Sequence, residues 1–499
     1  MARRTWALEG GTRMNRALPI LDWAFSQPDK ACLVTDERSY SYREVSLAIQ
    51  QVAASLMSAV GIGTRVGLFI DSTPNFIVYQ HAVFYLGGIV MPLNRALTEP
   101  EVVEVVTLVG LTIVVSDTPL ELPDGATNIV VAGEFDVPPP GAVIPTPAVL
   151  HPDAGACLLQ TSGSTGRPKG VLLSMGNLSS NYDATYRWIG IGKEDRILLT
   201  LPVFNTYALN QGINMMAMTG ATLRLVRRFS PERLQEVMNE FLPTFIPLVP
   251  TMVTRLHQAG VRFDGDVRVG IGAAASPSQI SADAWSVFPR AHIYFGYGLT
   301  EATAIVSTNH VGTKENNTGD YLSAGAVVPG VRVTIRDPSG EDARGEVLVW
   351  GRAVFSDYVG TAEPRPVEDG WLLTGDIGLF DEKRRLHIVD RKRELIIRGG
   401  QNIYPGEIER VLSSHPAVSE AAAVARADAD FGEVPVVYVV LRRGENVSGA
   451  KLLTWAAARL APFKVPEDVF VIDVMPKTPT GKIRKLDLRR GREVENAVS

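Results

Sequence analysis

The sequence has few cysteines, no long apolar run and no excess of positive charge. Its 499 residues include only two cysteines, Cys32 and Cys157, too few for a disulfide framework or a cysteine-based zinc site. A reducing compartment fits this cysteine usage best, and we expect a cytoplasmic protein. Arg3 and Arg4 are not followed by the apolar stretch and small-residue cleavage site of a secretory signal, so we expect none.

Charge and hydropathy exclude two further classes of protein. The most apolar segment, residues 102–115, carries Glu104 and is shorter than the roughly 20 residues that cross a bilayer, so we expect no membrane span. The net charge is −5, without the basic excess typical of nucleic-acid binders, and we expect no nucleic-acid partner. Apolar residues make up 45% and charged residues 21%, which indicates a globular protein with a core.

Helical and strand patterns alternate along the chain up to Arg391. Predicted helices at residues 41–59, where Ser41 is a possible cap, and 76–87 are followed by predicted strands at 65–70 and 88–92. This alternation is typical of α/β layers with mainly parallel sheets.

The character of the sequence changes after Gly330. Short apolar runs separated by Gly, Pro and Asp predict a small β-rich subdomain, and a compact unit of about a hundred residues follows Arg391. We therefore expect an α/β multidomain protein. Its large N-terminal domain comprises two α/β subdomains plus the β-rich one, and a small α+β domain lies at the C-terminus.

The strongest local signal is a Gly-, Ser- and Thr-rich loop at residues 161–170, directly after a predicted strand at 156–160. Glycines let backbone N–H groups crowd around an anion, hydroxyls add donors and Lys169 adds a positive charge, so the loop suits a polyphosphate. A flexible surface loop is the alternative, and the preceding strand and the closing lysine argue against it. The loop is not a Walker loop, because no Gly-Lys-Ser/Thr triplet closes it.

Residues 297–301 place an aromatic ring, a hydroxyl and a carboxylate at a predicted strand-to-helix turn. Tyr297 can stack on a base, Thr300 can donate to a phosphate and Glu301 can hold Mg²⁺. The start of a capped helix is the ordinary explanation of a Thr-Glu pair. A nearby glycine-rich turn at residues 270–275 matches a loose dinucleotide fingerprint, but the acidic residue expected after the next strand is missing, so we reject that interpretation.

Two later segments also contain charged side chains suited to a nucleotide. Asp376 and Arg391 suit a ribose diol, although a turn residue and a surface ion pair would explain them equally well. Residues 476–482 form a stiff Pro- and Gly-containing loop that ends in Lys482, for which a solvated basic tail is the alternative.

Taken together and in this order, the segments resemble the adenylate-forming superfamily, which includes acyl-CoA synthetases, aryl-acid ligases, luciferases and nonribosomal peptide adenylation domains. The resemblance covers nearly the whole chain and rests on residues 161–170, 272–274, 297–301, 374–376, 391, 399–409 and 479–482. It implies an N-terminal adenylation domain at residues 1–392 and a mobile C-terminal domain at residues 393–499.

The resemblance implies a role for each matching residue. Thr300, Glu301 and Lys482 are the implied catalytic residues, and Glu301 is the implied Mg²⁺ ligand. Lys482 would bridge the attacking carboxylate, the α-phosphate and the ribose oxygen, a position suited to catalysis by charge stabilisation. The implied ATP and AMP contacts are Thr161, Ser162, Gly163, Ser164, Thr165, Gly166, Lys169, Ala274, Ala275, Tyr297, Gly298, Thr300, Asp376, Arg391 and Lys482.

The implied acid pocket departs from the usual pattern of the family, because Asn205 stands where acyl-CoA synthetases usually carry His. Asn does not titrate, but it can donate to a carboxylate or to a polar ring substituent. The small Gly272 and Ala273 leave room for a ring, so we expect an aryl or bulky alicyclic acid. The pocket positions are Phe204, Asn205, Val249, Gly272, Ala273 and Ala302.

The resemblance also implies a second half-reaction, in which the C-terminal domain swings and Gly399 and Gly400 line a tunnel for a pantetheine thiol. The hinge position, usually Asp or Lys, is Arg393 here. We expect ATP- and Mg²⁺-dependent formation of an acyl-adenylate with release of pyrophosphate, followed by transfer to CoA. Two alternatives stay open: a stand-alone adenylation enzyme that serves a carrier protein or another enzyme, and a nucleotide-binding module without catalysis.

Overall fold

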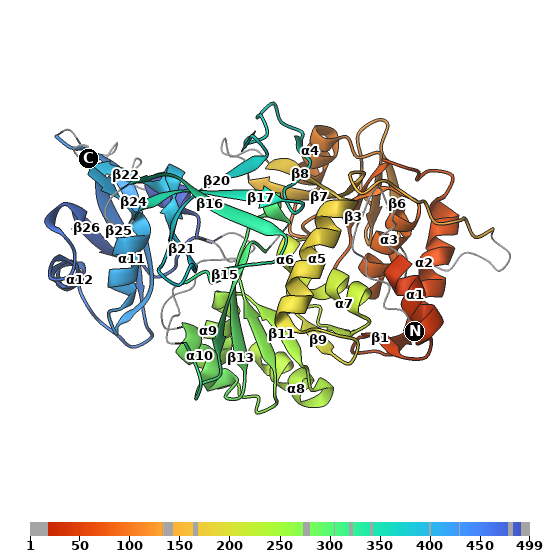
Figure 1. Ribbon diagram of the computed structural model, residues 1–499, viewed down its shortest axis with the longest axis horizontal. Coiled ribbons are helices and arrows are strands. Elements are labelled where there is room, and N and C mark those ends of the chain that lie inside the picture. Colours follow the sequence, from red (N-terminus) through yellow and green to blue (C-terminus); the bar gives the residue numbers. More distant parts are fainter. Residues whose placement is uncertain are drawn as a thin grey trace.

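The computed structural model describes residues 18–131, 133, 143–162, 168–272, 280–303, 305–318, 323–339, 343–398, 401–428, 430–477 and 483–490. Four sheets organise these residues, and Figure 1 shows the C-terminal sheet at one end of the molecule and the N-terminal helices at the other. Among the described helices, none combines the length and the hydropathy that crossing a membrane requires.

The first sheet has the strand order β18-β8-β7-β4-β3-β5-β6. Helix α2, which precedes the first of these strands in the chain, begins where the sequence indicates: Ser41 caps it by accepting the Glu44 N–H, while the Glu44 carboxylate accepts the Ser41 N–H. The elements are α1 (Leu18–Ser26), α2 (Tyr42–Leu56), β3 (Arg65–Phe69), α3 (Pro74–Tyr85), β4 (Ile89–Pro92), α4 (Glu99–Val109), β5 (Ile113–Ser116), β6 (Thr127–Val130), β7 (Gly155–Ser162), β8 (Pro168–Ser174), α5 (Met175–Ile189) and β18 (Asp357–Val359).

The second sheet has the order β15-β14-β13-β12-β11-β9-β10-β1-β2. It shares its core with the first sheet, because residues such as Ile49, Phe76, Leu199 and Met216 belong to one buried cluster. The elements are β1 (Ala31–Val34), β2 (Ser39–Ser41), β9 (Arg196–Leu199), α6 (Thr206–Ala208), the π-helix η1 (Leu209–Ile213), α7 (Asn214–Thr219), β10 (Thr222–Leu225), α8 (Pro231–Phe241), β11 (Phe245–Leu248), α9 (Pro250–Gln258), β12 (Arg268–Ile271), α10 (Ile280–Val287), β13 (His292–Tyr297), the 3-10 helix η2 (Thr300–Ala302), β14 (Ser307–Gly312) and β15 (Ala326–Val327).

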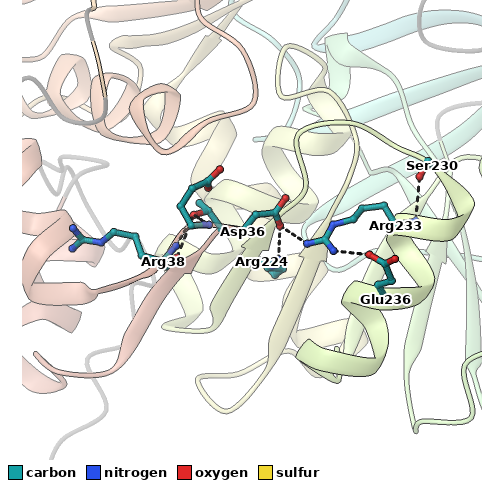
Figure 2. Close-up of polar contacts among 8 residues, drawn as sticks. Asp36, Arg38, Arg224, Ser230, Arg233 and Glu236 are labelled. Atoms are coloured by element: carbon teal, nitrogen blue, oxygen red, sulfur yellow. Dashed lines mark hydrogen bonds and ion pairs between the residues drawn. The ribbon is translucent and has the colours of Figure 1, made fainter.

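Two arginines converge on Asp36 and tie the turn between β1 and β2 to the second sheet (Figure 2). Arg224 of β10 lies 2.5 Å from the Asp36 carboxylate, and Arg233 of α8 lies 2.7 Å from the same oxygen. The side chain of Arg224 is only 6% exposed. A guanidinium this buried needs a counter-charge, and Asp36 supplies it from a segment far away in the sequence.

The third sheet is the predicted β-rich subdomain, with the order β16-β17-β20-β19 and β21 paired to β20. The last sheet, β23-β22-β25-β24 with β26 beside β25, belongs to the C-terminal unit. The elements are β16 (Val331–Ser339), β17 (Arg344–Gly351), β19 (Val367–Glu368), β20 (Trp371–Phe380), β21 (Leu386–Arg391), η3 (Lys392–Glu394), β22 (Ile396–Arg398), β23 (Gln401–Ile403), α11 (Pro405–Ser413), β24 (Val418–Asp428), β25 (Gly432–Leu441), α12 (Gly449–Ala457), η4 (Pro462–Lys464), β26 (Asp468–Val471) and α13 (Lys485–Arg490).

The predicted α/β class is confirmed. Both large sheets are mainly parallel, and their antiparallel pairs lie toward the edges, where β8 meets β7 and β18, where β14 meets β13 and β15, and where β2 meets β1. The two cysteines, Cys32 and Cys157, are free and buried. Burial raises the pKa of the Cys157 thiol to about 12, so this thiol stays protonated at neutral pH.

Candidate active site

A buried carboxylate, Asp376, lies at the centre of the candidate nucleotide site. The pairing of β20 with β21 sets Asp376 opposite Arg391, whose Nε forms an ion pair with Asp376 Oδ1 at 3.0 Å. The Tyr297 hydroxyl at the end of β13 donates to the other oxygen at 2.6 Å. Arg391 therefore pairs across the strands with a buried carboxylate, while its own side chain stays 44% exposed.

These contacts keep the three groups in the forms that a ribose site needs. Asp376 is only 2% exposed, yet each of its oxygens has a partner, the Tyr297 hydroxyl on one and the Arg391 guanidinium on the other. Burial and the adjacent carboxylate raise the pKa of Tyr297 well above its ordinary value, so its hydroxyl remains a donor at neutral pH. A carboxylate accepts several hydrogen bonds at once, which leaves acceptor capacity for a diol. The cluster joins three residues that the sequence analysis assigned to one nucleotide.

Thr300 and Glu301 lie on a single turn of 3-10 helix, η2, between β13 and β14. A strand does lead into a helix here, but the helix is a single 3-10 turn without a side-chain cap, and not the capped helix that is the ordinary explanation of a Thr-Glu pair. The turn ends at Thr303, a β-branched residue with φ of 54°, which is rare and costs free energy. The Thr303 hydroxyl donates to the carbonyl of Ala353 at 2.6 Å, and the Phe355 N–H donates to the Glu301 carbonyl at 2.8 Å.

The Glu301 side chain meets the phosphate-loop lysine through one tyrosine. The Tyr358 hydroxyl donates to Glu301 Oε1 at 3.0 Å, and Lys169 Nζ lies 3.6 Å from the centre of the Tyr358 ring. Lys169 also pairs with Glu363 at 2.8 Å. The Thr161 hydroxyl at the start of the phosphate loop is buried and has no hydrogen-bond partner among the described residues. A hydroxyl that bonds a ligand would have this environment in the unliganded protein.

The residues present fit Mg²⁺. No described residue bonds the second oxygen of Glu301. Mg²⁺ is commonly held by one or two carboxylates together with phosphate oxygens and water. Glu301 supplies one such carboxylate.

The candidate acid segment touches the nucleotide segment through two hydroxyls. Thr206 Oγ1 lies 3.1 Å from Thr300 Oγ1. Just before it, the side-chain oxygen of Asn205 caps α6 by accepting the Ala208 N–H at 2.7 Å. The cap occupies the amide oxygen of Asn205, so its Nδ2 is the group left to donate to a ligand.

Gly272 makes room for a side chain of the protein. A Cβ added to Gly272 would lie 3.3 Å from the Tyr207 ring, and one added to Gly270 would lie 3.0 Å from the Tyr207 hydroxyl. The space that the sequence analysis assigned to the acid beside Gly272 is thus occupied by Tyr207. Burial raises the pKa of Tyr207 above its ordinary value, so the phenol stays neutral.

The other predicted positions fall into three groups: those whose side chains are described, those whose backbone alone is described, and those outside the described residues. Ala302 is fully buried, Val249 is mostly buried, Phe204 is half-buried and Gly298 is exposed. Arg393 lies within η3, and its side chain, like that of Ser162, is not among those described. The positions that lie outside the described residues are Gly163, Ser164, Thr165, Gly166, Ala273, Ala274, Ala275, Gly399, Gly400 and Lys482.

The sequence analysis missed Tyr207, Tyr358 and Glu363. Tyr207 lies within the predicted acid segment, two residues after Asn205, so its position along the chain was the available signal. Tyr358 and Glu363 are 57 and 194 residues from their partners Glu301 and Lys169, and no local pattern marks them.

Two cavities lie away from these residues. One of about 500 Å³ is lined by β16 and β20 residues, including Arg332 and Trp371. The other, of about 310 Å³, is lined by Thr222, Arg224 and Glu240 among others. Neither includes a predicted site residue, so the candidate site rests on its polar contacts.

Comparison with known proteins gives the same picture along the whole chain. Residues 21–359 match the model of the AMP-binding enzyme family, and residues 407–482 match that of the AMP-binding enzyme C-terminal domain. The 4-coumarate–CoA ligase CCL1 of Humulus lupulus is 30% identical over 527 residues, which cover 96% of this chain and 95% of the ligase.

Two solved structures are similar over most of their length. MatB from Rhodopseudomonas palustris with bound ATP has a TM-score of 0.86 and 27% identity, over 96% of this chain and 99% of that one. O-succinylbenzoate coenzyme A synthetase (MenE) from Bacillus subtilis, in complex with ATP and a magnesium ion, has a TM-score of 0.83 and 28% identity, over 96% and 99% of the two chains.

Proposed function

The chain belongs to the AMP-binding enzyme family, and from this membership we propose that it is an AMP-forming acid–CoA ligase. It uses ATP and Mg²⁺ to convert a carboxylic acid into its acyl-adenylate, releases pyrophosphate and transfers the acyl group to the thiol of CoA. The resemblance to the adenylate-forming superfamily inferred from the sequence is confirmed.

The observation that supports adenylation best is the 3.1 Å contact between Thr206 and Thr300. It joins the candidate acid segment to the turn that carries Glu301. Adenylation needs this proximity, because a carboxylate oxygen of the acid attacks the α-phosphorus of ATP. The bond from that phosphorus to the oxygen bridging the β-phosphate breaks, and pyrophosphate leaves with the electron pair. Holding two reactants in contact removes much of the entropic barrier.

We assign the nucleotide contacts from the polar groups described above. Asp376 and Arg391 hold the ribose, and the Tyr297 ring faces the base. Thr161 and Lys169, together with the backbone of the loop between them, hold the outer phosphates. Glu301 would hold Mg²⁺, which neutralises charge on the phosphates when it is bound.

Lys482 and the C-terminal unit complete the proposal. Lys482 bridges the acid carboxylate and the α-phosphate during adenylation. The unit beyond the Arg393 hinge then moves, and Gly399 and Gly400 admit the pantetheine arm. The thiolate sulfur attacks the acyl carbon, the bond to the phosphate oxygen breaks and AMP leaves. A pantetheinylated carrier protein presents the same thiol and is the alternative acceptor.

For the acid, we propose an aryl or bulky alicyclic carboxylate with a polar substituent. The described pocket positions Phe204 and Val249 are apolar. The same short segment carries two neutral polar groups, the Nδ2 of Asn205 and the Tyr207 phenol, and we assign to either a bond to a ring substituent. Coumarate and succinylbenzoate, the acids in the names of two similar proteins, are of this class.

Pyrophosphate release across a panel of aryl, alicyclic and fatty acids, with CoA present or withheld, tests the proposal. We expect release with a subset of aryl or alicyclic acids and formation of the matching acyl-CoA. Release with no thioester until a carrier protein is supplied would identify the stand-alone adenylation enzyme. ATP binding without release for any acid would leave a nucleotide-binding module.

A further inference from the structure

Tyr358 lies between Lys169 and Glu301, the two charged residues that the proposed reaction assigns to the phosphates and the Mg²⁺ of one ATP. It lies on β18, the edge strand whose pairing with β8 sets Tyr358 opposite Val171, two residues after Lys169. Its ring lies under the Lys169 ammonium, 3.6 Å from Nζ, and its hydroxyl donates to Glu301 Oε1 at 3.0 Å. One side chain therefore contacts both the phosphate-loop lysine and the candidate metal ligand.

The surroundings of Tyr358 fix it on both sides. The Ser356 N–H donates to the Leu172 carbonyl of β8 at 2.9 Å, and the Phe355 N–H donates to the Glu301 carbonyl at 2.8 Å. The Phe355 ring packs against the Tyr358 ring with the centroids 4.7 Å apart. The segment at residues 355–359 is thus bonded to the strand of Lys169 and to the turn of Glu301, so the tyrosine ring has little freedom to move relative to either.

Lys169 has little freedom of its own. Its side chain is 11% exposed, and Glu363 pairs with it at 2.8 Å. An ammonium held between a carboxylate and a ring face keeps its position without a ligand, and it has three N–H groups, so it can still donate to a phosphate. Glu363 and Tyr358 together hold the lysine in place for the phosphates.

We propose that Tyr358 is a positioning residue for adenylation. Its hydroxyl turns the Glu301 carboxylate so that Oε1 is occupied and the other oxygen is presented to Mg²⁺, while its ring supports Lys169. The inference rests on the proposed function, since it assigns a partner to two groups of that site. Groups that bond a metal-ligating carboxylate from behind commonly change metal affinity by about 10- to 100-fold when they are removed.

The test separates the two contacts of Tyr358 by measuring ATP binding rather than turnover. The dissociation constant of ATP is measured by titration calorimetry with Mg²⁺ and with EDTA. The constant in EDTA divided by the constant with Mg²⁺ reports the metal-dependent part of binding. Tyr358→Phe removes only the hydroxyl, so the ratio should fall by about tenfold, with ATP affinity in EDTA unchanged. Tyr358→Leu also removes the ring, and affinity in EDTA should then fall by about three- to tenfold.

A matched control is Tyr85→Phe. The Tyr85 hydroxyl also donates one partly buried hydrogen bond, to the Pro145 carbonyl at 2.7 Å, and it lies on α3, which contributes no residue to the proposed site. This variant should match Tyr358→Phe in any loss of thermal stability and leave both dissociation constants at the wild-type values. Tyr358→Phe keeps the ring and its packing, so it decides the question even where Tyr358→Leu fails to fold.

The outcomes separate the positioning role from the function. A wild-type protein whose ATP affinity does not respond to Mg²⁺ would overturn the proposed function itself. A wild-type response that Tyr358→Phe leaves intact would overturn only the role of the hydroxyl. Equal losses with Mg²⁺ and with EDTA in Tyr358→Phe would show that Tyr358 merely supports the fold of the site.

Discussion

Replacing Asp376 with Asn tests the candidate ribose site most directly. The residue keeps its size, and the side-chain oxygen of Asn can still accept from Arg391. The Tyr297 hydroxyl, which now donates to Asp376 at 2.6 Å, can turn and accept the new N–H. Both neighbours stay bonded, and water at the 44% exposed Arg391 side chain compensates for most of the lost charge, so we expect the free energy of unfolding to fall by only about 1 kcal/mol.

ATP binding should suffer far more. The carboxylate is 2% exposed, so a ribose hydroxyl that bonds it meets a charged acceptor shielded from water. Hydrogen bonds to charged groups contribute about 1.5–3 kcal/mol. At about 1.4 kcal/mol for each factor of ten, the dissociation constants of ATP and AMP should rise by about 10- to 100-fold. That of pyrophosphate, which has no ribose, should stay unchanged. Titration calorimetry with the three ligands measures these effects.

Asp381→Asn is the matched control. Asp381 directly follows β20, the strand of Asp376, and its carboxylate accepts from Arg385 and lies within bonding distance of His387. The control should lose stability without a change in ATP affinity. The ribose assignment is refuted if Asp376→Asn binds ATP and AMP as the wild type does, or if pyrophosphate binding weakens by the same factor as ATP binding.

Two further substitutions test the rest of the proposed function, and a third tests the raised pKa of Asp390. Lys482→Ala should reduce single-turnover adenylation at least about a hundredfold while ATP binding is largely kept; normal adenylation would remove Lys482 from the mechanism. Gly400→Leu should spare pyrophosphate release and slow thioester formation, and equal losses in both steps would argue against a thiol tunnel. Burial raises the pKa of the Asp390 carboxyl to about 6. The protonated form of this group therefore contributes fully to the free energy of unfolding of the wild type below about pH 4, and that contribution is lost as the pH rises to about 6. In urea unfolding, Asp390→Asn should therefore gain stability relative to the wild type over that interval, and a constant difference would contradict the raised pKa.

The sequence was a good guide wherever function depends on local pattern. The cap at Ser41 and the β-rich subdomain after Gly330 follow from capping chemistry and from the pattern of short apolar runs, and the structure has both. Asp376 and Arg391 could be assigned to one ribose because the order of motifs resembles a family. Their pairing across β20 and β21 depends on the register between these strands, which could not be predicted from the sequence.

The sequence was a poor guide where a contact joins distant segments. Gly272 indicated free space, but sequence alone cannot tell whether a substrate or a neighbouring ring takes that space, and the structure gives it to Tyr207. Tyr358 lies on an ordinary edge strand, and only the pairing of β18 with β8 brings it to Lys169. Such contacts depend on the tertiary arrangement of the sheets, so no local pattern predicts them.

The turn at Thr300–Ala302 explains how one short segment can serve the acid, the phosphates and the metal together. It ends in a strained, fully buried Thr303, and such strain persists only where the surroundings over-determine the backbone. The hydroxyl of Thr206 bonds this turn from α6, and the backbone of Phe355 and the hydroxyl of Tyr358 bond it from the segment at residues 355–359. A turn fixed by these two segments cannot adjust between the two half-reactions without breaking these contacts. We therefore assign the change between adenylation and thioester formation to the C-terminal unit, and the N-terminal site to a rigid role in both steps.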